Sequence, residues 1–291
     1  MLLAISRRNR AHGVLAAAAA AILFSTGGAA IKMAAFSGMQ VASIRSAIAA
    51  IALFLWIRGR IVWGWPTLAV ATVYAGTLTL FVTSTKLTTA ANAIFLQSTA
   101  PLYIVFLAPL LLGERFRRRD LLFMGAFAAG LALCFVGRPP ATVTAPDPAT
   151  GNVLGVLCSV TWALTLIGLR WAERLDARIG ISAVVVGNGL AFLVGAPFLL
   201  PLPTASAGEW ATLIYLGVIQ IAIAYIFLTA AIAELPALDV SLLLLLEPVL
   251  NPLWTWLIRG ENPGRWTLLG GGIILAATAA RTMTTKDTKT F

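Results

Sequence analysis

The sequence has few charged residues, and this shortage bounds the class of protein. Only 11% of the 291 residues are Asp, Glu, Lys or Arg, whereas soluble domains carry about 25%. That is too few to build a surface that faces water. Hydrophobic residues make up 59% of the chain, and the mean hydropathy is +0.91. We therefore expect an integral membrane protein whose outer surface contacts a lipid bilayer.

The sequence also lacks the motifs of common enzymes and ATP-driven pumps. It contains no Gly-x-x-x-x-Gly-Lys-Ser/Thr loop for nucleotide phosphates, and no His-Glu-x-x-His, Gly-x-Ser-x-Gly or Cys-x-x-Cys. The two cysteines, Cys134 and Cys158, lie inside apolar runs and are expected to pack as small hydrophobic residues. The one histidine, His12, precedes the first apolar run. We predict no enzyme activity, no cofactor and no metal site.

Long apolar runs dominate what is present. A bilayer core about 30 Å thick is spanned by a helix of about 20 apolar residues. The first run is too long for the core of a cleaved signal peptide, so it is expected to be a retained helix. The loops are mostly short, which makes successive helices antiparallel neighbours. We count ten spans, at 14–35, 40–57, 66–85, 88–112, 120–137, 152–172, 180–200, 209–232, 237–258 and 265–283.

The basic residues predict how these spans are oriented. The net charge of +10 comes from Lys and Arg clustered between apolar runs rather than on a soluble face, so we expect no nucleic-acid partner. Such clusters are typical of cytoplasmic loops. With a cytoplasmic N-terminus, 15 Lys and Arg residues fall on the cytoplasmic side and 4 on the outer side. We predict a multi-pass protein of a bacterial-type plasma (inner) membrane with both termini in the cytoplasm.

The two halves of the chain are related in sequence. Residues Ala90–Glu114 and Ala237–Glu261 align without a gap at a constant offset of 147, which pairs Pro101 with Pro248 and residues 113–114 with 260–261, both Gly-Glu. An offset of 138 pairs other positions: Gly13 with Gly151, Phe24 with Trp162 and Lys32 with Arg170. Because five helices per half is an odd number, the second half would enter the membrane with the opposite orientation. We predict an all-α polytopic membrane protein with ten transmembrane helices as two inverted five-helix repeats.

This pattern divides the chain into four parts. We expect the first repeat at 1–137, an external linker rich in proline and threonine at 138–151, the second repeat at 152–283 and a cytoplasmic tail at 284–291. Pro101 and Pro248 would each kink a helix in mid-span. A matched pair of kinks points to hinges beside a binding site between the repeats. A packing kink without a ligand role is the alternative.

The paired proline and Gly-Glu endings resemble those of the drug/metabolite transporter superfamily with its EamA-type repeat, and the resemblance covers residues 12–283. The chain is further similar to the bacterial exporters of aromatic and other neutral amino acids. The resemblance implies a secondary transporter that exports amino acids or related small metabolites by alternating access. The Gly-Glu endings at Glu114 and Glu261 are expected to form structural ion pairs at helix ends.

Glu247 is the one acidic residue near the centre of a span. A carboxyl group in the bilayer is expensive and is a functional hypothesis by default. It could bind a substrate ammonium or exchange a proton; a structural hydrogen bond to another helix is the alternative. No acidic residue precedes Glu114, so the first half supplies no membrane-embedded carboxylate, and transport driven only by the substrate gradient is a second possibility. Lys32, Arg45 and Lys86 lie near outer span ends and are expected to extend to water.

Polar and aromatic residues inside spans are the other candidates for a binding site. A neutral amino acid needs an apolar cavity with a few polar partners for its ammonium and carboxylate. For Trp162 and Tyr225, which lie in mid-span, the alternative is an interfacial belt position. Ser25, Tyr103 and Gln220 share the mid-span pattern. The predicted substrate-binding set is Phe24, Tyr74, Asn92, Gln97, Trp162, Tyr225, Glu247 and Asn251.

Two functions of other classes compete with a carrier. One is a membrane-embedded enzyme that acts on lipid, against which the missing catalytic motifs argue. The other is a channel, against which the paired kinked helices argue. Within the carrier hypothesis, another metabolite or a drug could be the substrate. The expected partners are a small-molecule substrate, protons as a candidate coupling ion and the lipid bilayer, and the protein is expected to be a monomer or a homodimer.

Overall fold

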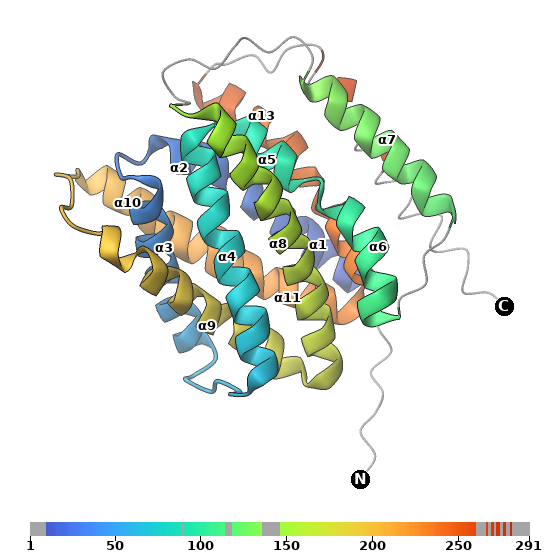
Figure 1. Ribbon diagram of the computed structural model, residues 1–291, viewed down its shortest axis with the longest axis horizontal. Coiled ribbons are helices and arrows are strands. Elements are labelled where there is room, and N and C mark those ends of the chain that lie inside the picture. The colour runs from blue at the N-terminus through green and yellow to red at the C-terminus, as the bar shows by residue number, and fades with distance from the viewer. Residues whose placement is uncertain are drawn as a thin grey trace.

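The computed structural model describes residues 10–88, 90–113, 118–135 and 146–259, and scattered residues between 266 and 280. Throughout these ranges the secondary structure is helical, with no strand. Seven of the helical stretches are long and apolar enough to cross a membrane. The chain is therefore a multi-pass helical membrane protein (Figure 1). The predicted tenth span at 265–283, most of the linker at 138–151, the Gly-Glu endings Glu114 and Glu261, and the tail lie wholly or largely outside the described residues.

Nine of the ten predicted spans fall on described helices, but four of them are not single uninterrupted α-helices. The first is split at Thr26, the fourth at residues 98–99 and the ninth at residues 244–245, while a π-helix interrupts the eighth. The elements in chain order are α1 Arg10–Ser25, α2 Gly27–Met33, α3 Gly38–Trp56, α4 Trp65–Leu87, α5 Ala90–Gln97, α6 Ala100–Leu112, α7 Arg118–Phe135, α8 Pro148–Leu175, α9 Ala177–Gly195, η1 Ala196–Phe198, α10 Ala207–Tyr215, η2 Leu216–Ile223, α11 Ala224–Glu234, α12 Ala237–Leu243 and α13 Leu246–Arg259.

Polar residues start several helices at the ends of the bundle. Ser37 and Ser206 each form a capping box with the residue three positions on, which satisfies backbone N–H groups that the helix leaves free. Asp147 accepts a hydrogen bond from the backbone N–H of Thr150 at the start of α8. These caps place the helix ends where the chain leaves the apolar runs.

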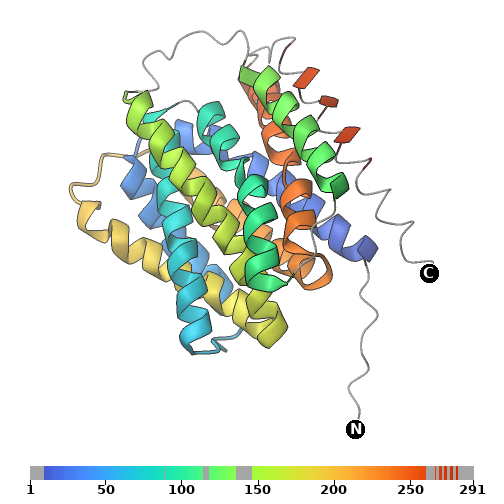
Figure 2. The ribbon, with the colours of Figure 1, turned by 45° about the vertical axis from the view of Figure 1, so that its right-hand side comes forward.

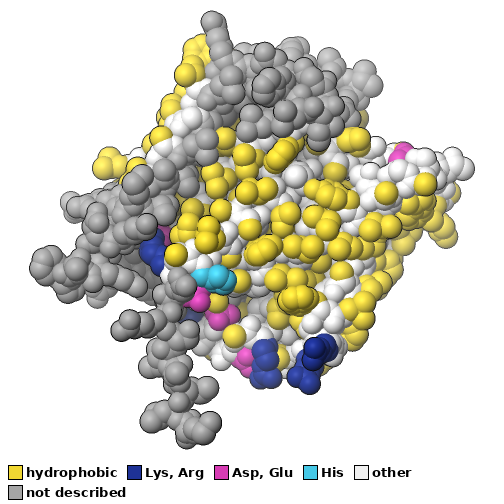
Figure 3. Space-filling model, turned by 180° about the vertical axis from the view of Figure 1, so that it is seen from behind, with side chains coloured by type: hydrophobic (Ala, Val, Ile, Leu, Met, Phe, Trp, Pro, Cys, Tyr) yellow, Lys and Arg dark blue, Asp and Glu magenta, His cyan; other side chains and the backbone are white. Residues whose placement is uncertain are grey.

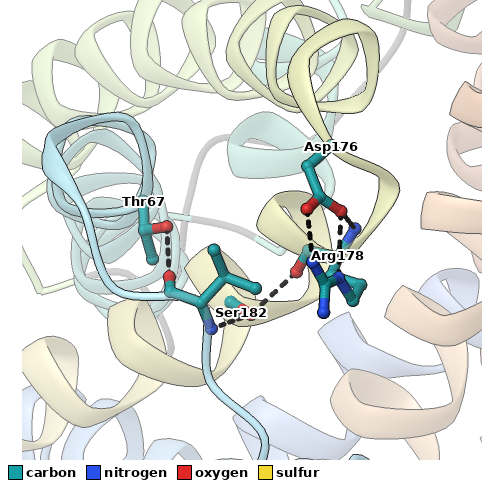
Figure 4. Close-up of polar contacts among 5 residues, drawn as sticks. Thr67, Asp176, Arg178 and Ser182 are labelled. Atoms are coloured by element: carbon teal, nitrogen blue, oxygen red, sulfur yellow. Dashed lines mark hydrogen bonds and ion pairs between the residues drawn. The ribbon is translucent and has the colours of Figure 1, made fainter.

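One end of the bundle is tied together by hydrogen bonds between the α3–α4 loop and the start of α9 (Figure 4). The backbone N–H of Val62 donates to Ser182 Oγ at 3.0 Å, and Thr67 Oγ1 donates to the Val62 carbonyl at 2.7 Å. Next to them, Asp176 accepts from the side chain and backbone N–H of Arg178. These bonds hold the pKa of Asp176 at about 2.

The interior is built from close helix contacts. The helix α4 packs against α8 and α9, α3 against α9 and η2, and α1 against α11. Small residues permit this approach: a Cβ on Gly187 would lie 2.8 Å from the Ala71 carbonyl oxygen, and one on Gly217 would lie 2.8 Å from that of Arg45. Small residues at helix crossings are typical of membrane proteins, because they let two backbones come close.

The outer surface is apolar. Large hydrophobic side chains stand exposed on several helices, among them Leu15, Ile51, Phe106, Leu122 and Leu193, all more than half exposed. Figure 3 shows hydrophobic side chains spread across the described part of one face, with the Lys and Arg side chains seen there at its periphery. Such a belt is suited to lipid and unsuited to water.

The two broken stretches α5–α6 and α12–α13 lie beside each other in the bundle (Figure 2). At each interruption a backbone hydrogen bond joins residues three apart instead of four. Thr99 N–H donates to the Leu96 carbonyl, and Glu247 N–H donates to the Leu244 carbonyl. At the kinks predicted for Pro101 and Pro248, the α-helical hydrogen bonding is thus interrupted by a tighter turn shortly before each proline. The helix α7 lies at the edge (Figure 1), where Phe123 and Ala126 pack against the hydrophobic cluster that contains Phe95 and Leu242.

Candidate functional site

A cavity lies at the centre of the bundle, where α1, α3, α4, α5, α8, η2, α11 and α13 meet. Its volume is about 30 Å³, which holds about two water molecules, since one needs about 10–15 Å³ on this measure. Both broken stretches contribute to its wall. The lining residues are Phe24, Arg45, Thr77, Leu78, Phe81, Gln97, Trp162, Gln220, Ile221, Tyr225 and Glu247.

An aromatic cluster forms one part of the cavity wall. Tyr225 of α11 lies at its centre, with its ring centroid 5.2 Å from that of Phe24, 4.7 Å from that of Tyr74 and 6.4 Å from that of Trp162. The rings meet edge to face, which is a favourable arrangement for aromatic quadrupoles. Phe24 and Trp162 complete the cluster at 6.2 Å, with perpendicular rings. The cluster gives the cavity a rigid apolar wall.

A second part of the wall is polar and comes from α3 and η2. Arg45 is 1% exposed, and its Nη1 donates to Gln220 Oε1 at 3.3 Å. Its Nη2 donates to the Leu78 carbonyl at 3.5 Å. Gln220 belongs to the π-helix, whose wider turn alters which side chains face inward. An amide and a guanidinium therefore face the same small space.

Glu247 reaches the cavity from the first turn of α13. Among the described residues, no hydrogen bond or ion pair to its carboxyl group is present. A side chain at a helix N-terminus also faces the positive end of the helix dipole, which favours negative charge there. Glu247 was expected near the centre of its span, and it lies there just after the interruption at residues 244–245. The structural hydrogen bond offered as the alternative is not seen among the described residues.

Five of the eight predicted binding residues line the cavity together: Phe24, Gln97, Trp162, Tyr225 and Glu247. Tyr74 is fully buried behind Tyr225, and its hydroxyl accepts a hydrogen bond from Asn188 Nδ2 at 3.0 Å. It supports the wall without forming it. The side chain of Asn92 lies outside the described part of the chain.

Asn251 forms a hydrogen bond at the break between α1 and α2 and does not line the cavity. Its Nδ2 donates to the Ser25 carbonyl at 2.8 Å, and Trp254 Nε1 donates to Ser25 Oγ at 2.7 Å. From α10, the Tyr215 hydroxyl donates to Thr26 Oγ1 at 2.7 Å. These groups form hydrogen bonds with polar atoms at the interruption, so Asn251 lies there and is not among the residues that line the cavity.

The expectation that Arg45 extends to water is wrong. Its guanidinium points inward because Gln220 and the Leu78 carbonyl offer acceptors inside the bundle, and the side chain is almost fully buried. Lys32 and Lys86 donate to the carbonyls of Thr88 and Ala34, at 2.8 and 2.6 Å, which ties neighbouring helix ends together. The signal for Arg45 was present in the sequence: it lies several residues inside an apolar run, on a helix that also carries Gln40, Ser43 and Ser46.

Comparison with known proteins shows the family. Residues 11–136 and 149–282 match the model of the EamA-like transporter family in two separate segments. The pseudopaline exporter CntI of Pseudomonas aeruginosa is 27% identical over 94% of this chain and 97% of its own length. The threonine/homoserine exporter RhtA of Escherichia coli K12 is 25% identical over 67% of this chain and 63% of its own. A solved crystal structure with 20% sequence identity covers 97% of this chain and 100% of its own with a TM-score of 0.79, which shows the fold.

These named relatives are exporters, and the family consists of transporters rather than enzymes. The resemblance to the drug/metabolite transporter superfamily is thereby confirmed. Since the two matched segments together cover most of the 291 residues, the chain belongs to the EamA-like transporter family of that superfamily.

Proposed function

We propose that the protein exports neutral amino acids, aromatic ones included, or closely related metabolites, and that the central cavity is the substrate site. The observation that carries this proposal is the composition of the cavity wall. Aromatic rings from α1, α8 and α11 face the same space as a carboxyl group from α13, which has no partner among the described residues, and amide groups from α5 and η2. The apolar side chain of an amino acid can contact the aromatic rings, and its ammonium group can bind the carboxyl group.

One of the two named relatives exports substrates of this class. RhtA exports threonine and homoserine, which are neutral amino acids, whereas CntI exports pseudopaline. The aromatic cluster of this chain favours larger side chains than that of threonine, because rings bind apolar surface. Protons are candidate coupling ions through Glu247, and flow down the substrate gradient alone is the alternative.

Alternating access is the proposed mechanism. The described cavity holds about two water molecules, so an amino acid fits only after helices move apart. The breaks at residues 98–99 and 244–245 adjoin the cavity-lining residues Gln97 and Glu247, and Pro101 and Pro248 follow them within three residues. A break frees the two segments of a span to tilt independently, which makes these positions the proposed hinges.

Two inverted five-helix repeats would supply the symmetry for such a motion. Exchanging the halves replaces α1–α2 by α8, α3 by α9, α4 by α10–α11, and α5–α6 by α12–α13. The helix contacts support this exchange: α4 with α8 corresponds to α11 with α1, and α4 with α9 corresponds to η2 with α3. The contacts of α6 with α8 correspond to those of α13 with α1.

Two cations, the half-buried Lys32 and the buried Arg170, support the same symmetry. Lys32 donates to the Thr88 carbonyl at the end of α4, and Arg170 donates to the carbonyls of Ile232 and Ala233, at 2.6 and 3.2 Å, in the last turn of α11. Lys32 and Arg170 correspond at the offset of 138, and α4 corresponds to α11. Each cation thus lies at the negative end of an equivalent helix. We propose repeat boundaries at 1–137 and 152–283, with the linker at 138–151 outside and the tail at 284–291 in the cytoplasm.

Counterflow in proteoliposomes tests the proposed function. Vesicles that contain the purified protein are loaded with one unlabelled amino acid and diluted into its labelled form, across a panel of all twenty. We expect transient accumulation for a subset of neutral amino acids, with saturation at high concentration. Failure of every amino acid to accumulate would contradict the proposed substrate class, and flow without saturation would favour a channel.

A further inference from the structure

Arg45 is a buried cation that faces the substrate cavity. It lies in the second turn of α3, is 1% exposed, and contributes to the cavity wall. Moving a charge into an apolar interior is costly unless an opposite charge or good hydrogen bonds compensate it. The position of Arg45 therefore needs an explanation that the aromatic wall and Glu247 do not provide.

The partners that Arg45 has in this conformation compensate its charge poorly. A guanidinium has five N–H donors, and two bonds are present, at 3.3 Å to Gln220 and 3.5 Å to the Leu78 carbonyl. Both are longer than the usual 2.7–3.2 Å range, and both acceptors are neutral. Within the described part of the chain, the buried Nε has no hydrogen-bond partner. Across the described ranges, no carboxylate forms an ion pair with Arg45.

The missing group is an anion that can reach the guanidinium from the cavity. A carboxylate fits, because its two oxygens match two parallel N–H groups of arginine in a bidentate pair. Glu247, also without a partner in the described part, faces the same cavity from α13. A molecule with a carboxylate at one end and an ammonium at the other would compensate both groups at once.

We propose that Arg45 binds the substrate carboxylate while Glu247 binds the ammonium, so that the cavity selects zwitterionic α-amino acids over amines and acids of the same shape. This inference rests on the proposed function, and it adds a specificity-determining residue to it. Arg45 and Glu247 come from the two halves of the chain, so a bound zwitterion bridges α3 and α13. Gln220 would then orient the guanidinium through the bond seen here.

Three solutes of the same shape distinguish the contribution of the carboxylate to binding from that of the rest of the substrate. The set is L-phenylalanine, phenethylamine, which lacks the carboxylate, and 3-phenylpropionate, which lacks the ammonium. If the panel shows a preference for aliphatic side chains, L-leucine, 3-methylbutylamine and 4-methylpentanoate replace them. The apparent Kd of each solute is measured by competition with counterflow of the best amino acid, in wild type and in Arg45→Gln.

We expect the wild type to prefer the amino acid over its amine, and Arg45→Gln to remove that preference. Truncating one partner of a buried charge pair weakens binding by about 30-fold or more. Affinity for the amino acid should fall by that factor, while affinity for the amine changes less than about threefold. Arg45→Lys, which keeps the charge but loses the bidentate fork, should give an intermediate loss for the amino acid alone.

Lys32→Gln is the control, because it removes a half-buried cation that does not line the cavity. Its amino acid to amine ratio should equal that of the wild type, and thermal unfolding in detergent checks that each variant is folded. An unchanged ratio in folded Arg45→Gln and Arg45→Lys would overturn the inference, as would an equal loss for all three solutes. A wild type that transports no amino acid would instead contradict the proposed function, which is a separate result.

Discussion

At the scale of single residues, the charge on Glu247 is the feature most open to test. Glu247→Gln keeps the size and hydrogen-bonding capacity of the side chain but removes the charge. If Glu247 binds the substrate ammonium, loss of this charged hydrogen bond should lower the initial rate of counterflow at subsaturating substrate by about 10- to 100-fold. Initial rates are measured at several pH values and normalised to inserted protein.

Glu209→Gln is the control for this substitution, since Glu209 caps α10 away from the cavity and glutamine also suits that position. The control should transport at the wild-type rate. A wild-type rate and an unchanged pH profile in Glu247→Gln would show a structural role only. A pH dependence that the variant alone loses would favour proton exchange at this residue.

At the scale of helical elements, the break between α5 and α6 should matter for turnover more than for binding. Pro101 lies in the first turn of α6, where proline costs the helix little. Pro101→Ala would let the two segments join into one helix and so remove the hinge. We expect a roughly tenfold lower maximal rate, about 1.4 kcal/mol on the conformational step, with an apparent Kd near the wild-type value.

Pro109→Ala provides the comparison within the same element, because Pro109 lies inside α6 and away from the break. Its maximal rate should stay close to that of the wild type. Equal rates for Pro101→Ala and the wild type would remove the hinge from that position. Pro248→Ala tests the equivalent break before α13, and the proposed symmetry predicts a loss of similar size.

At the scale of the whole molecule, contacts between loops agree with the alternation of sides that ten spans require. Gln40 at the start of α3 bonds the carbonyls of Leu199 and Pro201, and Asp147 N–H bonds the Leu87 carbonyl. All these positions are expected outside. Arg10 pairs with Asp239 at 3.2 Å, and both are expected in the cytoplasm. The contacts indicate which loops share a side, and the charge bias predicts which side is cytoplasmic.

Labelling with a membrane-impermeant thiol reagent tests this orientation. In a protein carrying Cys134→Ser and Cys158→Ala, Thr204→Cys should react on intact bacterial cells, because the α9–α10 loop is expected outside. Arg60→Cys, in the α3–α4 loop, should react only after lysis. Both positions are exposed. The reverse pattern would invert the orientation, and labelling of both on intact cells would defeat the alternation of spans.

Hydropathy predicted where most helices run but not where they break. The run at 14–35 corresponds to α1 and α2, and the run at 88–112 to α5 and α6. The length of an apolar run matches the thickness of the bilayer whether or not the helix is interrupted. An interruption is tolerated because neighbouring helices form hydrogen bonds with the backbone groups that it frees. At Thr26 these partners are Tyr215 and Asn251, which lie far along the chain.

The candidate site was partly predictable for a related reason. Phe24, Trp162, Tyr225 and Glu247 stood out because polar and aromatic residues in mid-span are unusual. The sequence predicts Arg45 at the membrane surface, since an arginine near a span end can ordinarily extend to water. Only the packing of α3 against η2 showed that its acceptors lie inside the bundle.

The sequence by itself determined that this chain lies in a membrane, where its helices run, and to which superfamily it belongs. These properties follow from local composition, from apolar runs matched to a bilayer and from residue pairs at a fixed offset. The tertiary structure decided which side chains meet. Tyr225, Arg45 and Glu247 are far apart along the chain and share one cavity, because helix packing, which depends on small residues such as Gly187 and Gly217 at the crossings, brings their elements together.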